Sequence, residues 1–307
     1  MNTPLNRRDL LRHSGTIALA AGTAGVGGGF AAAAERTRAT APAGTPPRMK
    51  LGMVTYNIAP DWDLRTIIDR CRAVGLTGVE FRTTHKHGVE PTLSKDQRQE
   101  VRKRCADGGL VIWGLGSTCE YHSPDRAVLA KQIEDTKRFI ELAADLGAKG
   151  VKVRPNGLPQ EVSEEKTLEQ IGRSLRTVGE AAASAGVEIW CEMHGGGTSE
   201  PRRMRRIIDI ADHPSVGVTW NSNKGVDDKN GSVKESFALM WPKIYSVHIN
   251  ELINGYPYRE FFGLLNGHGY DRYTLMEISG LRSGQPDDTV RFMRFYKALW
   301  EELSRPA

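Results

Sequence analysis

The segment Val187–Gly197, VEIWCEMHGGG, is an apolar run that ends in an acid, an imidazole and three glycines. Side chains alternate along a strand, so Glu192 and His194 are expected on the same face. Other apolar runs also end in polar side chains: Glu80, Lys152, Arg154, Asn221, Asn223, His248, Asn250 and Glu277. One polar strand end is usually only solvated, but four consecutive runs each deliver a carboxylate, amide or imidazole. We therefore expect the chemistry of this chain at its strand ends.

Three oxygen donors and one imidazole nitrogen come from Glu192, Asn221, His248 and Glu277. Two carboxylates are costly to bury together unless a cation compensates their charge, so the set predicts a divalent metal. Its oxygen-rich composition favours Mn²⁺, Co²⁺ or Mg²⁺, with Zn²⁺ and Ni²⁺ as alternatives, over a closed structural zinc site. His194 is interpreted as a polar companion that faces the substrate or supports a ligand, and the glycines after it let substrate approach the backbone.

These donors can meet only if the elements that carry them are arranged in parallel. From Met49 onward, eight short apolar runs alternate with longer amphipathic segments. The expected strands are KLGMVTYNI, GVEFRTT, LVIWGLGS, GVKVRP, VEIWCEMHG, VGVTWNSN, IYSVHINEL and YTLMEIS. Between them, apolar residues recur at helical spacing, and several helices are expected to end at glycine, as at Gly75, Gly147 and Gly186.

Eight strand–helix units in residues 49–305 predict a single (β/α)8 TIM barrel, whose active sites lie at the carboxyl ends of the strands. A doubly wound open sheet is the alternative, and the absence of GxGxxG after the first strand disfavours it. Aromatic residues on or near the strands are expected mainly in the core, with a wall for a sugar ring as the other interpretation; they are Tyr56, Trp113, Trp190 and Trp220.

The chain of 307 residues has a formal net charge of +5, of which the first 34 residues contribute +2. The remaining +3 is too small to indicate nucleic acid as a partner. The four cysteines lie far apart without a CxxC pair, which excludes a zinc ribbon or a dense disulfide framework. We expect buried thiols, with a Cys71–Cys105 bridge as the alternative.

The amino-terminal segment has the layout of an export signal. Arg7 and Arg8 precede an Ala/Gly-rich run that ends in small residues, so residues 1–34 are predicted to be a twin-arginine-type signal peptide. Residues 35–48 are predicted to be a disordered Pro/Ala/Thr linker. A basic disordered terminus and a weak membrane anchor are the alternatives. The signal predicts an exported, periplasmic or extracellular protein without stable membrane association after cleavage.

The motifs GVEFR, EIWCEMH, GVTWN, YSVHINE and GYDRYTLMEIS, in this order, resemble the sugar phosphate isomerase/epimerase family with its xylose isomerase-like barrel. The resemblance spans Lys50 to Leu303. It implies that Glu, Asp, His and Glu on strands five to eight hold a divalent metal, here at Glu192, Asn221, His248 and Glu277. It also implies that the two glutamates act as acid and base.

The sequence departs from the family at two strand ends. Asn221 stands where the family has Asp, and Lys224 stands where it has His three residues later. The seventh-strand motif continues to Glu251 without the Asp and Arg of sugar epimerases. These changes leave the expected fold intact, but they weaken the inference of a particular reaction.

The resemblance predicts a divalent-metal-dependent isomerase or epimerase that acts on a keto-sugar or related polyol through enediolate proton transfer. The predicted substrate contacts are Glu80, Lys152, His194 and Asn250. Lys152 is interpreted either as a group that holds an oxyanion or carboxylate, or as a structural ion-pair partner of Glu80 or Glu192. Glu80 can likewise be an ion-pair partner inside the barrel.

Other functions share the same constellation. One is a metal-dependent lyase or hydrolase acting on oxidised (keto) glycosides, which export favours because phosphorylated metabolites are scarce outside the cytoplasm. Another is a non-catalytic periplasmic sugar-binding barrel, which the Asn221 substitution favours. An abasic-site endonuclease would need a second metal position built from loop histidines such as His85, His87 and His122. The expected partner is a small carbohydrate, and a homo-oligomer stays open.

Overall fold

The computed structural model describes residues 48–280 and 286–305. The predicted signal peptide, residues 1–34, and linker positions 35–47 lie outside the described residues. Among the helices of the described ranges, none is both long and apolar enough to cross a membrane.

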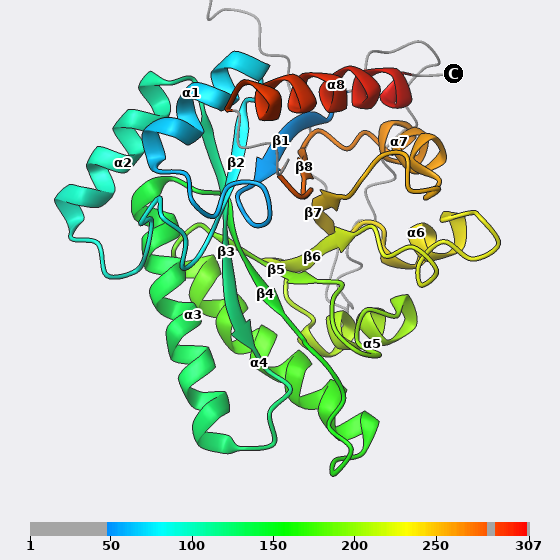
Figure 1. Cartoon of the computed structure of the whole chain (residues 1–307). Helices are drawn as coiled ribbons and strands as arrows, with labels where there is room; N and C mark the ends of the chain where they lie inside the picture. Colours follow the sequence, from blue (N-terminus) through cyan, green and yellow to red (C-terminus); the bar gives the residue numbers. More distant parts are fainter. Residues whose placement is uncertain (1–47, 281–285, 306–307) are drawn as a thin grey trace, which may run out of the picture. The chain divides into compact units, whose positions relative to one another are not determined.

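Eight parallel strands close into a barrel in the order of the sequence, and a helix follows each strand (Figure 1). The strands are β1 Lys50–Val54, β2 Gly78–Arg82, β3 Val111–Glu120, β4 Gly150–Arg154, β5 Glu188–Glu192, β6 Val216–Asn221, β7 Ile244–Ile249 and β8 Tyr273–Met276. The helices are α1 Leu64–Val74, α2 Lys95–Asp107, α3 Arg126–Leu146, α4 Glu164–Ser184, α5 Pro201–Ala211, α6 Lys234–Met240, α7 Tyr258–Gly267 and α8 Pro286–Ser304. The predicted (β/α)8 barrel is confirmed, and the open-sheet alternative is wrong because β1 pairs with both β2 and β8.

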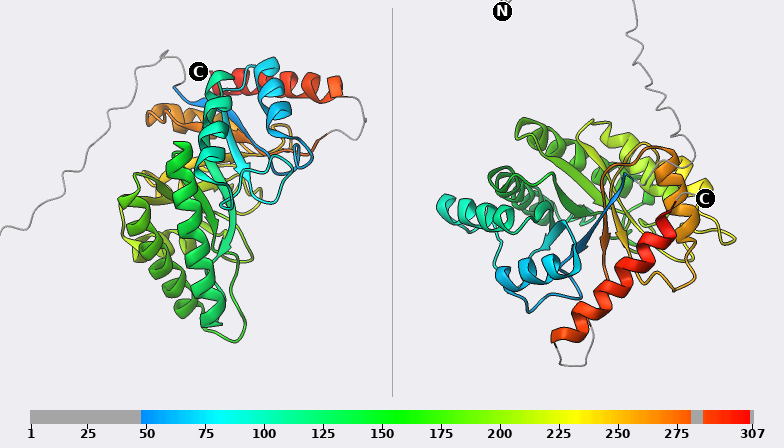
Figure 2. Two further views of the ribbon diagram at one scale, coloured as in Figure 1. Left: turned by 90° about the vertical axis from the view of Figure 1, so that its left-hand side faces the viewer. Right: turned by 90° about the horizontal axis from the view of Figure 1, so that it is seen from above.

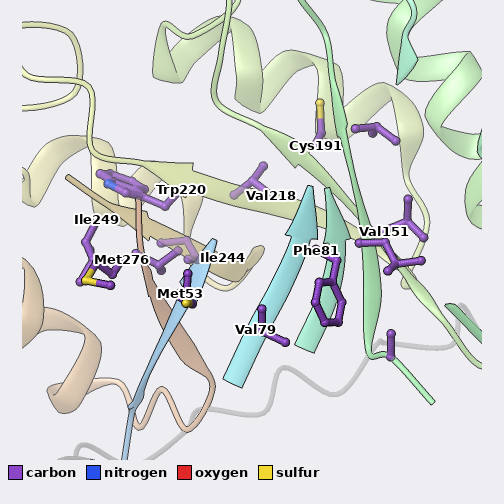
Figure 3. Close-up of a cluster of buried hydrophobic side chains, with 14 of the residues drawn as sticks. Met53, Val79, Phe81, Val151, Cys191, Val218, Trp220, Ile244, Ile249 and Met276 are labelled. Atoms are coloured by element: carbon purple, nitrogen blue, oxygen red, sulfur yellow. The ribbon is translucent and has the colours of Figure 1, made fainter. Parts of the chain in front are cut away.

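The main core lies between the strands and the surrounding helices, which form the outer ring in Figure 2. Alternate residues of each strand supply this core, as Val79 and Phe81 do on β2 and Val218 and Trp220 on β6 (Figure 3). Fully burying side chains of this size contributes about 1.5–3 kcal/mol each, so this layer fixes which face of every strand points outward. The other face must then point into the barrel.

A smaller cluster fills the barrel interior below the strand ends. It consists of Val54, Trp113, Trp190, Tyr273 and Leu275. Glycines on neighbouring strands make room for these rings, because a Cβ on Gly150 would lie 2.3 Å from a carbon of Trp190 and one on Gly78 would lie 2.4 Å from Tyr273. This apolar layer closes the barrel below the polar strand ends.

Local signals fix the ends of the helices. Asp63 accepts a hydrogen bond from the backbone N–H of Thr66 at the start of α1. Gly75 and Gly147 cap α1 and α3 in the left-handed conformation, as predicted. Gly186 also has a positive φ of 70°, although it follows the cap residue of α4.

All four cysteines are buried and free. The Cys71–Cys105 bridge, left as an alternative by the sequence, is therefore not formed, and the Cys71 thiol instead lies 3.4 Å from the sulfur of Met53. Burial raises the pKa of Cys71 to about 12, which keeps this thiol protonated and unreactive.

Candidate functional site

The strand register brings the polar strand ends to one level of the barrel. Asn221 on β6 pairs with His248 on β7, and Glu192 on β5 pairs with Thr219 on β6. Glu277 directly follows β8, and its N–H donates to the carbonyl of Ile249 at 2.9 Å. Since the alternate residues of these strands pack against the outer helices, the polar side chains converge inside the barrel.

Glu192, His248 and Glu277 form the centre of this convergence. Each offers one ligand atom, and these atoms lie within 4.8 Å of one another. His248 Nδ1 lies 3.4 Å from a carboxylate oxygen of Glu192 and 3.4 Å from one of Glu277. The imidazole is fully buried between the two carboxylates.

The chemistry and spacing of this set fit a divalent metal. Two ligands about 2.1 Å from one tetrahedral ion lie about 3.4 Å apart, which matches the spacing around His248 Nδ1. Within the described residues, His248 Nδ1 and Asn221 Oδ1 are buried atoms without a hydrogen-bond partner. Buried polar atoms usually have a partner, and a metal ion bound between these two atoms would supply one. The Asn221 amide nitrogen lies 3.5 Å from Glu192, so the Asn221 side chain belongs to the same cluster.

Two further charged residues surround these donors. The Lys152 ammonium donates to Glu192 at 2.7 Å, and the side chains of both residues are buried. Glu80 is fully buried and lies 3.3 Å from His248 Nε2, on the far side of the imidazole. The structure thus realises the ion pair between Lys152 and Glu192, and it makes Glu80 a partner of His248 inside the barrel.

Charge, more than burial, sets the protonation of this cluster. Burial by itself raises the pKa of Glu192, but the positive charges of Lys152 and His248 outweigh it and lower that pKa. Burial lowers the pKa of His248, yet the carboxylates of Glu80, Glu277 and Glu192 hold it well above the ordinary value. Without a metal, the opposite charges of Lys152, Glu192 and His248 therefore compensate one another.

Glu192 and Glu277 of this cluster line a pocket of about 140 Å³ at the carboxyl ends of the strands. Six predicted site residues line it: Glu80, Lys152, Glu192, His194, Asn221 and Glu277. His248 is fully buried and is not among the residues that line the pocket. Asn250, predicted to contact substrate, instead donates its side-chain amide to the Ser222 carbonyl at 3.0 Å and does not line the pocket.

His194 is held at the pocket wall by the loop that follows β4. Its Nδ1 lies 2.8 Å from Asn156 Oδ1. A Cβ on Gly195 would lie 2.7 Å from the Cα of Asn156, and Gly195 has a φ of 92°. Gly195 therefore admits the backbone of Asn156, whereas a Cβ on Gly196 would meet nothing within 4 Å.

Sequence reasoning did not assign a role to Arg82, Arg154 or Asn57, which also line the pocket. Arg82 lies two residues after Glu80, and Arg154 two residues after Lys152, so the alternation of side chains along a strand was a sufficient signal for both. Tyr56 stands at the mouth with 42% of its surface exposed, whereas Trp113, Trp190 and Trp220 are buried in the core.

The loop histidines do not extend the metal cluster. His87 uses both ring nitrogens on backbone groups, namely the carbonyl of Arg82 and the N–H of Val89. His122 lies 3.8 Å from Glu120, away from the pocket. In the part of the chain that the structure describes, these histidines join no group of three or more metal-ligating side chains.

Comparison with protein families agrees with this architecture. The family model described as xylose isomerase-like TIM barrel matches residues 68–299. A curated relative, the 3-dehydroshikimate dehydratase of Pseudomonas putida, is 28% identical over 126 residues, which are 40% of this chain and 19% of that protein. The match thus spans about a fifth of the length of the relative.

Solved structures of the same fold include an L-ribulose 3-epimerase, with a TM-score of 0.69 and 18% identity, covering 83% of this chain and 95% of that one. The IOLI protein with a binding zinc atom has a TM-score of 0.67 and 16% identity, covering 83% of this chain and 98% of that one. At these identities, the likeness shows the fold alone.

Proposed function

Because this chain belongs to the xylose isomerase-like TIM barrel family, we propose that it is a divalent-metal-dependent isomerase or epimerase. Its substrate would be a keto-sugar or related polyol, converted by proton transfer through an enediolate. The observation that carries the proposal is the convergence of Glu192, His248 and Glu277, whose ligand atoms lie within 4.8 Å of one another. The zinc atom in the IOLI protein and the sugar substrate named for the epimerase support it.

Glu192, His248 and Glu277 would hold the metal, with Asn221 Oδ1 as a fourth donor. A bound divalent cation supplies Lewis-acid polarisation of the substrate carbonyl and stabilises the negative charge that develops there. Mn²⁺, Co²⁺ and Mg²⁺ suit the oxygen-rich set, and Zn²⁺ or Ni²⁺ are the alternatives. The amide of Asn221 in place of a carboxylate leaves the site one negative charge poorer than the family pattern.

The two glutamates can transfer protons on two sides of the bound substrate. They reach the pocket from β5 and from the end of β8, and both face the same imidazole nitrogen. Lys152 keeps Glu192 in the ionised form that a general base needs, while the lowered pKa makes this carboxylate a weak base. With one glutamate removing a proton beside the carbonyl, the other would return it on the opposite face or on the neighbouring carbon.

A second candidate is an elimination reaction at the same site. The curated relative is named a dehydratase, and dehydration also begins with proton removal beside a ketone. The lyase acting on keto glycosides belongs to this class. Release of water or of an aglycone, without a change at a stereocentre, would distinguish it from the isomerase.

The test is exchange of substrate hydrogen with solvent. Metal-loaded protein is incubated with L-ribulose, D-fructose and 3-dehydroshikimate in D₂O, and deuterium at the carbon beside the carbonyl is followed by NMR. Glu277→Gln should slow exchange by about 100-fold or more, the usual effect of losing an acid–base group. Glu251→Gln is the matched control, because it makes the same change at an exposed position after β7.

Exchange that requires metal and Glu277 supports the proposal. Metal binding without exchange into any of these compounds would contradict it and favour a sugar-binding barrel. Export also stays a proposal, since residues 1–34 lie outside the described part of the chain.

A further inference from the structure

Three basic side chains line one side of the pocket. Arg82 ends β2, and Lys152 and Arg154 lie on β4. Both strands flank β3, where Gly116 pairs with Arg82 on one side and with Lys152 on the other. The Glu80 carboxylate fills the space beside this glycine, because a Cβ on Gly116 would lie 2.9 Å from Glu80 Oε1.

Arg82 and Arg154 differ from Lys152, whose ammonium is paired with the buried carboxylate of Glu192. One guanidinium nitrogen of Arg82 donates to the carbonyl of Thr83 at 2.6 Å and to the hydroxyl of Thr84 at 3.1 Å. Among the residues that the structure describes, no carboxylate lies within 4.0 Å of Arg82. Its remaining donors are available at the pocket wall.

Arg154 is tied to one carboxylate but retains an unused donor. A terminal nitrogen pairs with Glu120, whereas Nε is buried and, within the described residues, has no hydrogen-bond partner. This N–H has almost no accessible surface, so a ligand in the pocket would reach Arg154 through the terminal nitrogens of its guanidinium. Burial, followed by the positive charge of Arg154, lowers the pKa of Arg82, and the negative charges of Glu192 and Glu90 act against this shift; the two guanidiniums therefore lie close enough to repel each other.

The charges of the residues that line the pocket also indicate an anionic ligand. Three carboxylates, Glu80, Glu192 and Glu277, balance the three basic residues. Glu120 adds a fourth negative charge through its ion pair with Arg154, so a divalent cation held by the glutamates and His248 would leave a surplus of one positive charge. A neutral sugar would not offset that surplus, whereas a substrate that carries an acid group would.

We propose that the substrate carries a carboxylate, and that Arg82 and Arg154 bind it on the β2–β4 side of the pocket while the keto group lies over Glu192, His248 and Glu277. This inference deepens the proposed function and rests on it. Guanidinium groups suit such a role, because their planar donor forks match the two oxygens of a carboxylate. The substrate class is therefore a keto-acid sugar, such as a ketohexuronate, in preference to a neutral ketose.

The test compares three ketoses that differ only at C6: D-fructose, D-fructuronate and D-fructose 6-phosphate. Dissociation constants are measured by calorimetry on the metal-loaded full chain. We expect wild type to bind D-fructuronate at least about tenfold more tightly than D-fructose, the effect of one or two charge-assisted hydrogen bonds. Arg82→Gln should reduce that preference to about twofold or less, and Arg82→Lys should restore part of it.

Arg65→Gln is the matched control, since it removes the same charge from an exposed position on α1. The inference is overturned if wild type shows no preference for D-fructuronate over D-fructose, if Arg82→Gln keeps the preference, or if D-fructose 6-phosphate binds more tightly than D-fructuronate. Metal content and solvent exchange, measured on the same samples, separate the two proposals. Metal-dependent exchange without a carboxylate preference would remove only this inference, and an Arg82-dependent preference without exchange would remove only the proposed reaction.

Discussion

Asn221→Asp restores the carboxylate that the family carries at this strand end, and its effect can be estimated from the metal-free geometry. The Asn221 amide nitrogen lies 3.5 Å from Glu192. Two unit charges about 4 Å apart repel by about 4 kcal/mol at an effective dielectric constant of about 20. Protonating the new carboxylate at pH 7 would also cost about 4 kcal/mol, since its ordinary pKa is about 3.9 and each pH unit is worth about 1.4 kcal/mol.

The positive charges of Lys152 and His248 offset part of this repulsion, so we expect metal-free Asn221→Asp to lose about 2–4 kcal/mol of unfolding free energy. A bound cation removes the repulsion, and metal affinity should therefore rise by at least about tenfold. Thermal unfolding without metal and competition titration with a chromophoric chelator measure the two effects.

Asn57→Asp is the matched control, because it adds the same charge to an exposed residue of the same pocket. It should change stability and metal affinity by much less. Equal effects of the two substitutions, or weaker metal binding by Asn221→Asp, would refute the reasoning that Asn221 belongs to the metal centre.

Other substitutions test the remaining parts of the account. Lys152→Met leaves Glu192 buried without its 2.7 Å partner, which should lower the unfolding free energy of the metal-free protein by about 3–5 kcal/mol. Added Mn²⁺ should then stabilise this variant more than it stabilises wild type. Equal unfolding temperatures without metal would contradict this expectation. Burial raises the pKa of Asp227 to about 7 from 3.8, so the folded protein retains a proton that the unfolded chain has lost, and stability should fall as the pH rises from about 4 to about 7. Asp227→Asn should therefore stabilise the protein by up to about 4 kcal/mol at pH 8 and little at pH 4 in urea unfolding, and a pH-independent difference would refute the assignment. Gly150→Ala places a Cβ 2.3 Å from an indole carbon of Trp190 and should lower the unfolding free energy by about 1–3 kcal/mol. Gly263→Ala in α7 is the control, because its Cβ would meet nothing within 4 Å. Similar unfolding temperatures for both variants would show that the interior layer is not tightly packed.

The barrel and the centre of its site could be predicted because both follow from local patterns. Alternation of side chains fixed the inward face of β5, β6 and β7, and parallel pairing required Glu192, Asn221 and His248 to meet at one end of the barrel. Glu277 follows from the same argument on the last strand. Arg82 follows from the same rule, since it lies two residues after Glu80 on β2.

Other features depend on contacts that no strand pattern contains. Asn250 lies beyond the end of β7, where alternation no longer holds, and its amide turns to the carbonyl of Ser222. Gly195 packs against Asn156 from a distant loop. The partner of Lys152 could not be chosen between Glu80 and Glu192 from the sequence, because both lie on the inner face and only the three-dimensional packing decides the distance.

The central claim is that Glu192, His248 and Glu277 hold a catalytic divalent metal, and metal content tests it most directly. Wild type and the Glu192→Gln, Glu277→Gln double variant are purified without chelator and analysed by mass spectrometry, with circular dichroism to verify that both are folded. We predict a near-stoichiometric divalent metal in wild type and its loss in the double variant. Folded wild type that contains no metal, and that stays empty after addition of Mn²⁺ or Zn²⁺, would contradict the account.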